Sequence, residues 1–311
     1  MMERDKMNVS KNILKVAHYE AFSDIPGKGN PAGVVFDADN LNEDQMQIIA
    51  KKVGFNETVF LLKSDKADLR IRYFTPGHEI NLCGHGTVTS IYGLMRKNNV
   101  NSSQDLRIET LAGILKVHYD HTLQEIKMSQ AAAEFIEFHG DLDRLADSIG
   151  LLREDIDLRY PIVYGSTGTW TLILPIRNLE SFLRMKPKNR SFKEILTQMP
   201  NASIHPLCLE TFEKTCTMHG RHFSASHSGT IEDPVTGTAS GVMGAYYLSY
   251  IEPSDQIELC IEQGNEIGRK GIVRVYAEKR NSFINVNISG KAVYIGEMSI
   301  DYTHSCLEST S

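Results

Sequence analysis

The chain has 311 residues, enough for two ordinary domains or one large one. Apolar residues make up 41% of it and charged residues 23%, so a packed core can form. The formal charge of −6 excludes the basic surface that nucleic-acid binding requires, and no apolar run approaches the ~20 residues that span a membrane.

Cysteine usage favours a reducing compartment. The chain has five cysteines, an odd number, and no CxxC pair. They are Cys83, Cys208, Cys216, Cys260 and Cys306. This pattern is unlike the disulfide framework of a secreted protein, and the polar first twelve residues contain no apolar signal segment. We therefore expect no disulfide framework and a cytoplasmic location.

The first half of the chain predicts one mixed α/β unit. In chain order we expect a strand, a helix, two alternating strands, a second helix and a hairpin. These are residues 32–36, 44–54, 58–63, 68–74, 87–95 and 106–120. The second helix follows a Gly/Thr turn and is small or apolar all round, which predicts that it lies buried at the centre of the unit.

The second half repeats the first at an offset of 151 residues. Gly86 and Thr87 correspond to Gly237 and Thr238, and residues 106–113 correspond to residues 257–264 at the same offset. After an insert at 265–271, the strand pattern resumes. Self-similarity at a fixed spacing indicates a duplicated unit. The sequence thus predicts an N-terminal lobe of residues 1–130, completed by 291–303, and a C-terminal lobe of residues 131–290.

Both buried helices begin at glycine-containing turns, CGHGT at 83–87 and DPVTGTAS at 233–240. A helix N-terminus exposes unpaired N–H groups and favours anions, and Gly84, Gly86 and Gly237 would let a ligand approach the backbone. The alternative is that these glycines only permit tight turns. Because the two turns occupy equivalent positions and each has a titratable neighbour, His85 or Asp233, we favour a carboxylate-binding site between the lobes.

Two further residues are candidates for chemistry. Glu57 lies among Phe55, Val59 and Phe60, where burial would suit it to proton transfer, although a solvated glutamate at a strand start is the simpler alternative. Cys83 is a nucleophile, a base, a metal ligand or a buried inert thiol. No zinc signature surrounds Cys83 and no nucleotide-binding motif occurs, so we expect neither a metal nor a cofactor.

Five ordered motifs resemble the PhzF-like family, named for the phenazine-biosynthesis isomerase. The resemblance covers roughly residues 14–300. The motifs are GNPAGVV (29–35), GFNETVF (54–60), FTPGHEINLCGHGT (74–87), DPVTGTASG (233–241) and EQGNEIGR (262–269). The resemblance implies an α+β diaminopimelate-epimerase-like fold, with two pseudo-symmetric lobes in which a sheet wraps a central helix.

By the same resemblance, Glu57 is the acid/base, and His85, Asp233 and Thr238 complete the catalytic set. Thr238 stands where the phenazine enzyme's motif has serine. Substrate binding is assigned to Asn30, Asn56, Gly84, Gly86 and Gly237. Cysteine-dependent racemases of this superfamily have a cysteine at both helix starts. This chain has Cys83 at the first start and a threonine at the second, so a two-thiol mechanism lacks one partner.

These observations predict a cofactor-independent isomerase that moves a proton on a small carboxylate-bearing metabolite. Two alternatives stay open, namely a Cys83-dependent amino-acid or hydroxy-acid racemase or epimerase, and a non-catalytic binding protein that kept the fold. The expected partner is the small carboxylate substrate, without nucleic acid or membrane. A homodimer is left open as the quaternary state.

Overall fold

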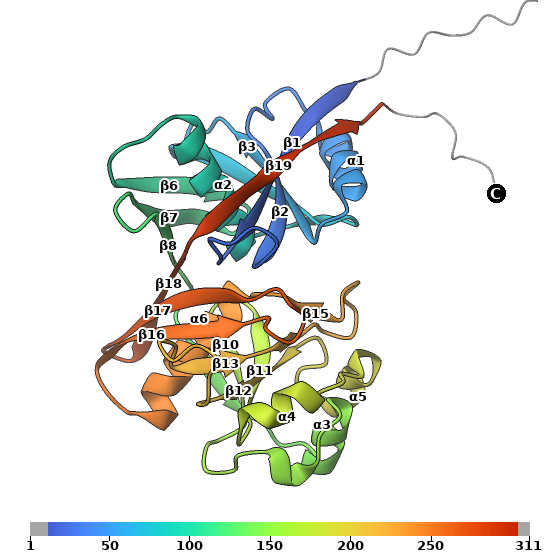
Figure 1. The fold of residues 1–311 in the computed structure, drawn as a ribbon, viewed down its shortest axis with the longest axis vertical. Coiled ribbons are helices and arrows are strands. Elements are labelled where there is room, and N and C mark those ends of the chain that lie inside the picture. The colour runs from blue at the N-terminus through green and yellow to red at the C-terminus, as the bar shows by residue number, and fades with distance from the viewer. Residues whose placement is uncertain (1–11, 304–311) are drawn as a thin grey trace, which may run out of the picture.

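The structure is a computed structural model that describes residues 12–303, so Cys306 and the N-terminal segment 1–11 lie outside the described residues. Figure 1 shows two bodies joined by long strands. The upper body is built mainly from the first half of the chain. Its elements are β1 (Ile13–Ala21), β2 (Asn30–Val35), α1 (Glu43–Val53), β3 (Glu57–Leu62), β4 (Leu69–Phe74), β5 (Glu79–Ile80), α2 (Gly84–Lys97), β6 (Gln104–Thr110), β7 (Gly113–Asp120) and β8 (Glu125–Ser129).

The lower body in Figure 1 is built mainly from the second half. Its strands are β9 (Glu134–Glu137), β10 (Val163–Ser166), β11 (Trp170–Pro175), β12 (Ser203–Cys208), β13 (Met218–Gly220), β14 (His222–Phe223), β15 (Glu232–Asp233), β16 (Gln256–Gln263), β17 (Gly271–Arg280) and β18 (Phe283–Gly290). Its helices are α3 (Leu142–Ser148), α4 (Leu179–Arg184), α5 (Phe192–Ile195) and α6 (Gly237–Tyr246), the last continued by a π-helical turn, Tyr247–Ile251. The final strand, β19 (Ala292–Asp301), returns to the upper body.

Both lobes use one order of strand pairing. β2 runs parallel to β3, β3 is antiparallel to β4, and β4 is parallel to β6. In the second lobe β11 is parallel to β12, β12 is antiparallel to β13, and β13 is parallel to β16. The hairpin of β6 and β7 likewise corresponds to that of β16 and β17. This agreement confirms the predicted α+β class with two similar lobes.

The two halves of the chain exchange strands. β8 pairs antiparallel with β18 where the lobes meet, so the sheet continues from one lobe into the other. After β8 and after β18, the chain passes from one lobe into the other. β9 pairs with β10 in the second lobe, and β19 pairs along its length with β1 in the first. Each lobe is therefore completed by a strand that follows the other lobe's hairpin.

The helices fall into an inner and an outer set. α2 and α6 contact each other and lie in one large core that includes Val88 and Ile91 from α2 and Val242 and Met243 from α6. The sequence prediction that both helices are buried is thus confirmed. α1 packs outside the first lobe through Met46 and Ile49, and α3, α4 and α5 pack outside the second over a separate cluster. Because apolar burial dominates folding, the two inner helix N-termini are held firmly at the lobe junction.

Phe22 connects the two lobes through its ring. Its backbone has a positive φ of 63°. That value is unfavourable for a bulky side chain and has to be held by surrounding contacts. The Phe22 N–H donates to the carbonyl of Lys291, and its own carbonyl accepts from the N–H of Ile272. A Cβ added at Gly237 or Gly290 would meet the Phe22 ring at 2.9 or 2.4 Å, so these glycines make room for it.

The insert at residues 265–271 also contacts the first lobe. The guanidinium of Arg269 donates to buried Glu20 at 3.1 Å, and the amine of Lys28 donates to the carbonyl of Gly268 at 2.8 Å. The backbone N–H of Gly29 donates to the carbonyls of Arg269 and Lys270. The segment that distinguishes the second copy of the repeat therefore bridges the lobes.

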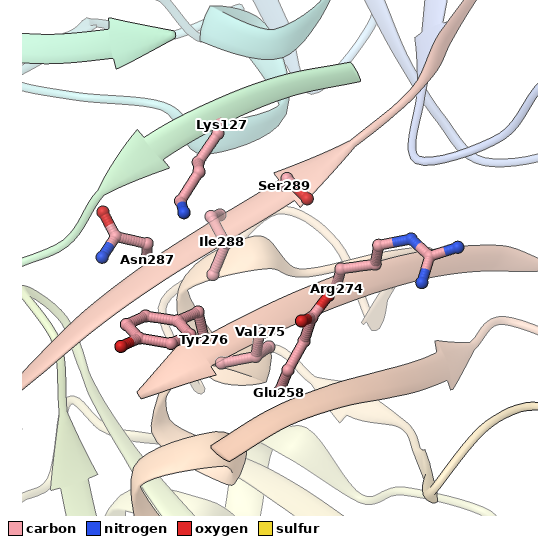
Figure 2. Close-up of a pocket in the computed structure, with 8 residues that line it drawn as sticks. All are labelled: Lys127, Glu258, Arg274, Val275, Tyr276, Asn287, Ile288 and Ser289. Atoms are coloured by element: carbon pink, nitrogen blue, oxygen red, sulfur yellow. The ribbon is translucent and has the colours of Figure 1, made fainter. Parts of the chain in front are cut away.

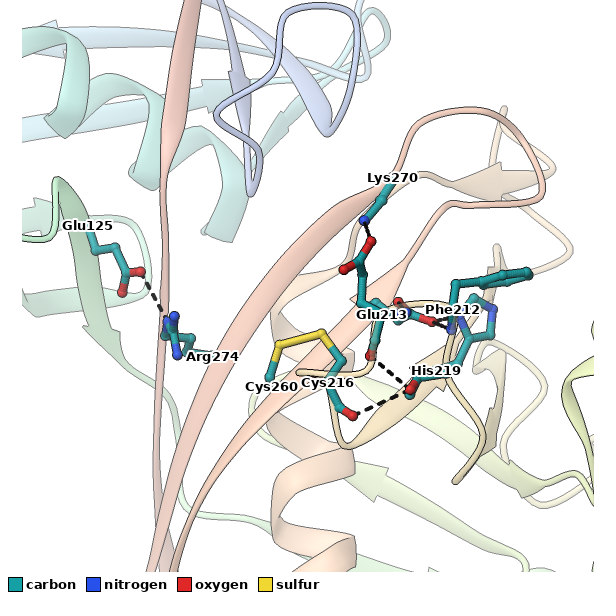
Figure 3. Close-up of a disulfide and its surroundings, with 10 residues drawn as sticks. Glu125, Phe212, Glu213, Cys216, His219, Cys260, Lys270 and Arg274 are labelled. Carbon is teal, nitrogen blue, oxygen red and sulfur yellow. Dashed lines mark hydrogen bonds and ion pairs between the residues drawn. A yellow bond between two sulfur atoms is a disulfide. The ribbon is translucent and has the colours of Figure 1, made fainter.

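The structure contains one disulfide, although the sequence predicted no disulfide framework. Cys216 and Cys260 form a disulfide, drawn in Figure 3, across a Cα–Cα distance of 4.4 Å. The reason is strand register, since Cys216 comes just before β13 and Cys260 lies in β16, which runs beside β13. The N–H of Thr217 donates to the carbonyl of Cys260 at 2.7 Å. A linear sequence gives no signal for a pairing of residues 44 apart.

Within residues 12–303, no helix has both the length and the apolar composition that crossing a membrane requires.

Candidate active site

Glu57 and His85 form a close pair at the start of the first inner helix. α1 ends at Val53, and its C-cap Gly54, with a φ of 74°, turns the chain toward β3, where Glu57 is the first residue. His85 is the second residue of α2. The Glu57 Oε2 and His85 Nε2 atoms lie 2.9 Å apart, with only 16% and 9% of the two side chains exposed. The sequence thus named two residues that lie in direct contact.

Cys83 completes this cluster. It caps α2, and its Sγ accepts from the N–H of Gly86 at 3.3 Å. The same sulfur lies 3.4 Å from His85 Nδ1. Burial raises the pKa of the Cys83 thiol, although His85 and the Gly86 N–H oppose that effect. Burial alone would lower the pKa of His85, but Cys83 and Glu57 together raise it well above its usual value.

Asp233 lies at the start of the second inner helix. It ends β15, three residues before Thr236, the N-cap of α6. The Thr236 hydroxyl donates to Asp233 Oδ2 at 2.5 Å, while Asn30 and Asn56 donate to Oδ1 at 2.8 and 3.5 Å. Asn30 and Asn56 belong to the first lobe, so the Asp233 carboxylate is held by groups from both lobes.

Asn30 links the two halves of the site. It is fully buried at the start of β2. Its Nδ2 lies 2.8 Å from Asp233 Oδ1, 2.8 Å from the carbonyl of Val235 and 3.3 Å from His85 Nδ1. Its Oδ1 is buried and has no hydrogen-bond partner among residues 12–303. The amide nitrogen is thus occupied by the protein, whereas the buried Oδ1 has no partner among these residues. The substrate-binding role of Asn30 stays a prediction.

The predicted glycines face different surroundings. A Cβ on Gly84 would meet nothing within 4 Å, so a ligand has room at this position. A Cβ on Gly86 would meet Val59 at 2.9 Å, and one on Gly237 would meet Ile288 at 2.6 Å. The glycine requirement at Gly86 and Gly237 thus has a packing reason. Thr238 is partly exposed, and its carbonyl accepts from the Thr167 hydroxyl at 3.0 Å.

Two residues at the second helix start were not among the predicted site residues. The Gln263 side chain donates to the carbonyl of Asp233 at 2.8 Å and accepts from the N–H of Thr236 at 3.2 Å. Gln263 and Thr236 therefore fix the turn that presents Asp233. Both fall inside motifs that carry the family resemblance, and this was the only sequence signal for them.

Glu57, Cys83 and His85 are also the residues that could hold a metal ion. One potential ligand atom from each lies within 4.8 Å of the others. Thiolate, imidazole and carboxylate together suit zinc. The absence of a metal requirement therefore stays a prediction.

Two cavities lie away from these residues. One of about 90 Å³ opens where the lobes join, between Lys127 of β8, Asn287 of β18 and Tyr276 of β17, as Figure 2 shows. The other, of about 260 Å³, lies near the C-terminal end of α2, against Tyr92, Arg96 and His121. The pocket that the sequence predicted beside Glu57 and Asp233 stays a prediction.

Two repeated lobes around inner helices, with an ionisable pair at one helix start and a carboxylate at the other, define a diaminopimelate-epimerase-like protein. The chain shares this fold with the solved structure of a hydroxyproline epimerase from Agrobacterium vitis. The two have 11% sequence identity and a TM-score of 0.64, and the match covers 94% of this chain and 93% of the other.

Within this fold, a family model assigns the chain to one particular family. A family model described as phenazine biosynthesis-like protein matches residues 19–298, so the chain belongs to the PhzF family. It is 52% identical to a PhzF-family phenazine biosynthesis protein from Bacillus anthracis, whose crystal structure matches with a TM-score of 0.90 over 93% of this chain and 99% of that chain. The resemblance seen in the sequence is confirmed.

Curated relatives agree with this family. The chain is 50% identical over 282 residues to the uncharacterized isomerase YfhB of Bacillus subtilis, a match that covers 90% of this chain and 96% of that protein. It is 34% identical over 289 residues to the uncharacterized isomerase YddE of Escherichia coli, with the same coverage of the two chains.

Proposed function

We propose that this protein is a cofactor-independent isomerase that moves a proton between two carbon atoms of a small carboxylate-bearing metabolite. The isomerase class rests on the family and on the names of its relatives. The assignment of the proton carrier rests on one observation, the 2.9 Å pair of Glu57 and His85 at the start of α2.

Glu57 is the acid/base in this proposal. Its buried Oε2 lies 2.9 Å from Nε2 of His85, so we assign the proton transfer to the other oxygen, Oε1. Oε1 takes the proton from one substrate carbon and returns it to another, so no net acid or base is consumed. His85, with its raised pKa, donates through Nε2 and holds the carboxyl group in place.

The substrate carboxylate binds at the inner helix starts in this proposal. The open space at Gly84 gives it access to backbone N–H groups at the positive end of α2. These N–H groups also stabilise the negative charge that spreads from the reacting carbon toward the carboxylate as the proton leaves. Asp233 completes the site from the second lobe.

Solvent-deuterium uptake tests the proposal. Purified protein is incubated in D₂O with a panel of small carboxylates, and mass spectrometry detects products that gain deuterium. Glu57→Gln keeps the shape of the side chain but removes the acid/base, so uptake should fall by about 10²–10⁴-fold. Glu134→Gln, at an exposed glutamate of β9, serves as the matched control and should exchange like the wild type. Full exchange by Glu57→Gln would refute the assignment.

A Cys83-dependent racemase is the second candidate, because Cys83 Sγ lies 3.4 Å from His85 Nδ1. Two observations count against it. Burial raises the pKa of the thiol, which disfavours the thiolate, and the N-cap of the opposite helix is Thr236. Cys83→Ala should therefore retain most of the deuterium uptake. If Cys83→Ala is inactive while Glu57→Gln remains active, the racemase mechanism replaces the glutamate mechanism.

A non-catalytic binding protein is the third candidate. Such a protein would gain stability from small carboxylates, since a ligand that binds only the folded state raises the melting temperature. It would show no deuterium uptake with any member of the panel. The two measurements together therefore separate binding from catalysis.

A further inference from the structure

Two histidines and a methionine form a chain of contacts inside the second lobe, behind Asp233. His205 lies in β12 and is fully buried, His222 lies in β14, and Met243 lies in α6. His205 Nε2 is 2.9 Å from Met243 Sδ, and His205 Nδ1 is 3.1 Å from His222 Nδ1. The two imidazole rings are tilted by 52° with their centroids 5.3 Å apart.

These contacts determine which nitrogen carries each hydrogen. The thioether sulfur of Met243 carries no hydrogen and can only accept a hydrogen bond. In its contact with His205, the donor is therefore Nε2 of His205. His205 is neutral at neutral pH, because burial holds its pKa well below the usual value. A neutral imidazole carries one hydrogen, so Nδ1 of His205 is an acceptor and Nδ1 of His222 must donate to it.

The same reasoning leaves a lone pair on the outer nitrogen of His222. Burial lowers the pKa of His222, so this ring is also neutral at neutral pH, and its single hydrogen is already placed on Nδ1. Its Nε2 is then an acceptor. The hydrogen bond of His222 to His205 uses Nδ1, and the His222 side chain is partly exposed.

His222 lies beside the candidate site. In the antiparallel pair of β14 and β15, His222 is directly opposite Asp233. Directly opposed residues of two strands project on the same face of a sheet, with their Cβ atoms about 4.5–5.5 Å apart. The His222 ring therefore lies beside Asp233 on the second lobe.

We propose that His222 is a specificity-determining residue whose unprotonated Nε2 accepts a hydrogen bond from a hydroxyl or ammonium group of the substrate. This rests on the proposed function in one respect, namely that the substrate is a small carboxylate. It deepens that function by naming the substrate class, a carboxylate that also carries a hydrogen-bond donor. Met243 and His205 act as positioning residues, because together they fix the tautomer of His222.

The first test reads the tautomer directly in the full-length protein. Long-range ¹H–¹⁵N correlation spectra of histidine-labelled protein distinguish a protonated from an unprotonated ring nitrogen. The His222 signals are assigned by their loss in His222→Gln. We expect His222 at neutral pH to be protonated on Nδ1 and unprotonated on Nε2. A proton on Nε2, or a doubly protonated ring, overturns the proposal.

The second test uses lactate and propionate, two carboxylates that differ by one hydroxyl group. Titration of the wild type, followed by protein NMR shifts, should show roughly 2- to 10-fold tighter binding of lactate, as expected for one hydrogen bond. His222→Phe has no acceptor and should bind both equally, whereas His222→Gln offers a carbonyl oxygen and should keep the preference. His227→Phe, at an exposed histidine a few residues along the chain, is the control and should behave like the wild type.

The outcomes separate this proposal from the proposed function. Equal binding of the two probes by the wild type, no measurable lactate binding, or a preference that survives in His222→Phe refutes the role of His222. The titrations are repeated in Glu57→Gln, where the lactate preference should persist because binding does not need the acid/base. If Glu57→Gln still takes up deuterium while the lactate preference depends on His222, the mechanism fails and the His222 assignment stands.

Discussion

The Nε2 atom of His85 lies 2.9 Å from Oε2 of Glu57 at a junction where both side chains are largely buried. A charged pair in such a place is stabilised by mutual attraction and loses much of that stabilisation when one partner is neutralised. The pair therefore links the protonation of His85 to the identity of residue 57.

The first prediction concerns the pKa of His85. Glu57 is one of the groups that raise this pKa against the effect of burial, so the pKa should fall in Glu57→Gln. NMR titration of the His85 ring measures it. Because the pKa of His85 is raised in the folded state, the pair stabilises the folded protein fully below the ordinary imidazole pKa of about 6.5. This stabilisation is lost as the pH rises through the folded-state pKa of His85. Urea unfolding should thus show a larger advantage of the wild type over Glu57→Gln near about pH 6 than at alkaline pH. An unchanged His85 titration would contradict the prediction.

The second prediction concerns Asn30, which donates to Asp233 and Val235 across the lobe junction. Asn30→Asp keeps the size of the side chain but replaces the donating amide nitrogen with a carboxylate oxygen. This oxygen would face two other acceptors, the Asp233 carboxylate and the Val235 carbonyl. The free energy of unfolding should fall by about 1–3 kcal/mol, the cost of leaving such buried groups unpaired. Urea denaturation measures the loss. Asn101→Asp, at an exposed asparagine, is the control and should lose little. Equal stability of the two variants would show that the junction does not depend on this amide.

The third prediction compares the first residues of the two inner helices. Gly84 begins α2 with open space in the Cβ direction, whereas a Cβ at Gly237 would meet Ile288 and Phe22 at 2.6 and 2.9 Å. Gly237→Ala should lower the free energy of unfolding by about 1–3 kcal/mol, as overpacking does. Gly84→Ala should unfold like the wild type but raise KM for the carboxylate substrate. The opposite pattern would contradict the packing assigned to these two glycines.

The fourth prediction concerns metal. Glu57, Cys83 and His85 could coordinate zinc by geometry, yet the proposed proton transfer requires only the carboxylate and the imidazole. Elemental analysis of purified protein should find far less than one zinc per chain, and EDTA should leave deuterium uptake unchanged. Stoichiometric zinc that EDTA removes together with activity would instead make these three residues a metal site.

The repeat and the closeness of Glu57 to His85 agree with the sequence analysis, because the patterns behind them are local. A glycine turn that opens an apolar helix is visible in each half, and His85 and Asp233 lie within a few residues of those turns. The strand exchange through β9 and the disulfide of Cys216 with Cys260 could not be predicted, because both depend on which strands become neighbours.

The contacts that hold the site together could not be predicted either, although the sequence had named Asn30 as a candidate. Asn30 is buried because of the way β2 meets the second lobe, and Gln263 reaches Thr236 only after β16 is in place. The positive φ of Phe22 is not required by its neighbours in the sequence. It accompanies the packing of the Phe22 ring against Gly237 and Gly290 of the other lobe. Such contacts follow from tertiary packing, so a pattern within one segment does not reveal them.

The pairing of β1 with β19 has a consequence for synthesis in the cell. Ile13 of β1 lies opposite Asp301 of β19, so β1 leaves the ribosome long before the strand that pairs with it is made. Chains are made at about 5–20 residues per second, which leaves β1 without this neighbour for about 15–60 s. During that interval the unpaired edge of β1 can pair with another chain, so the separation of β1 and β19 in the sequence exposes the chain to aggregation during synthesis.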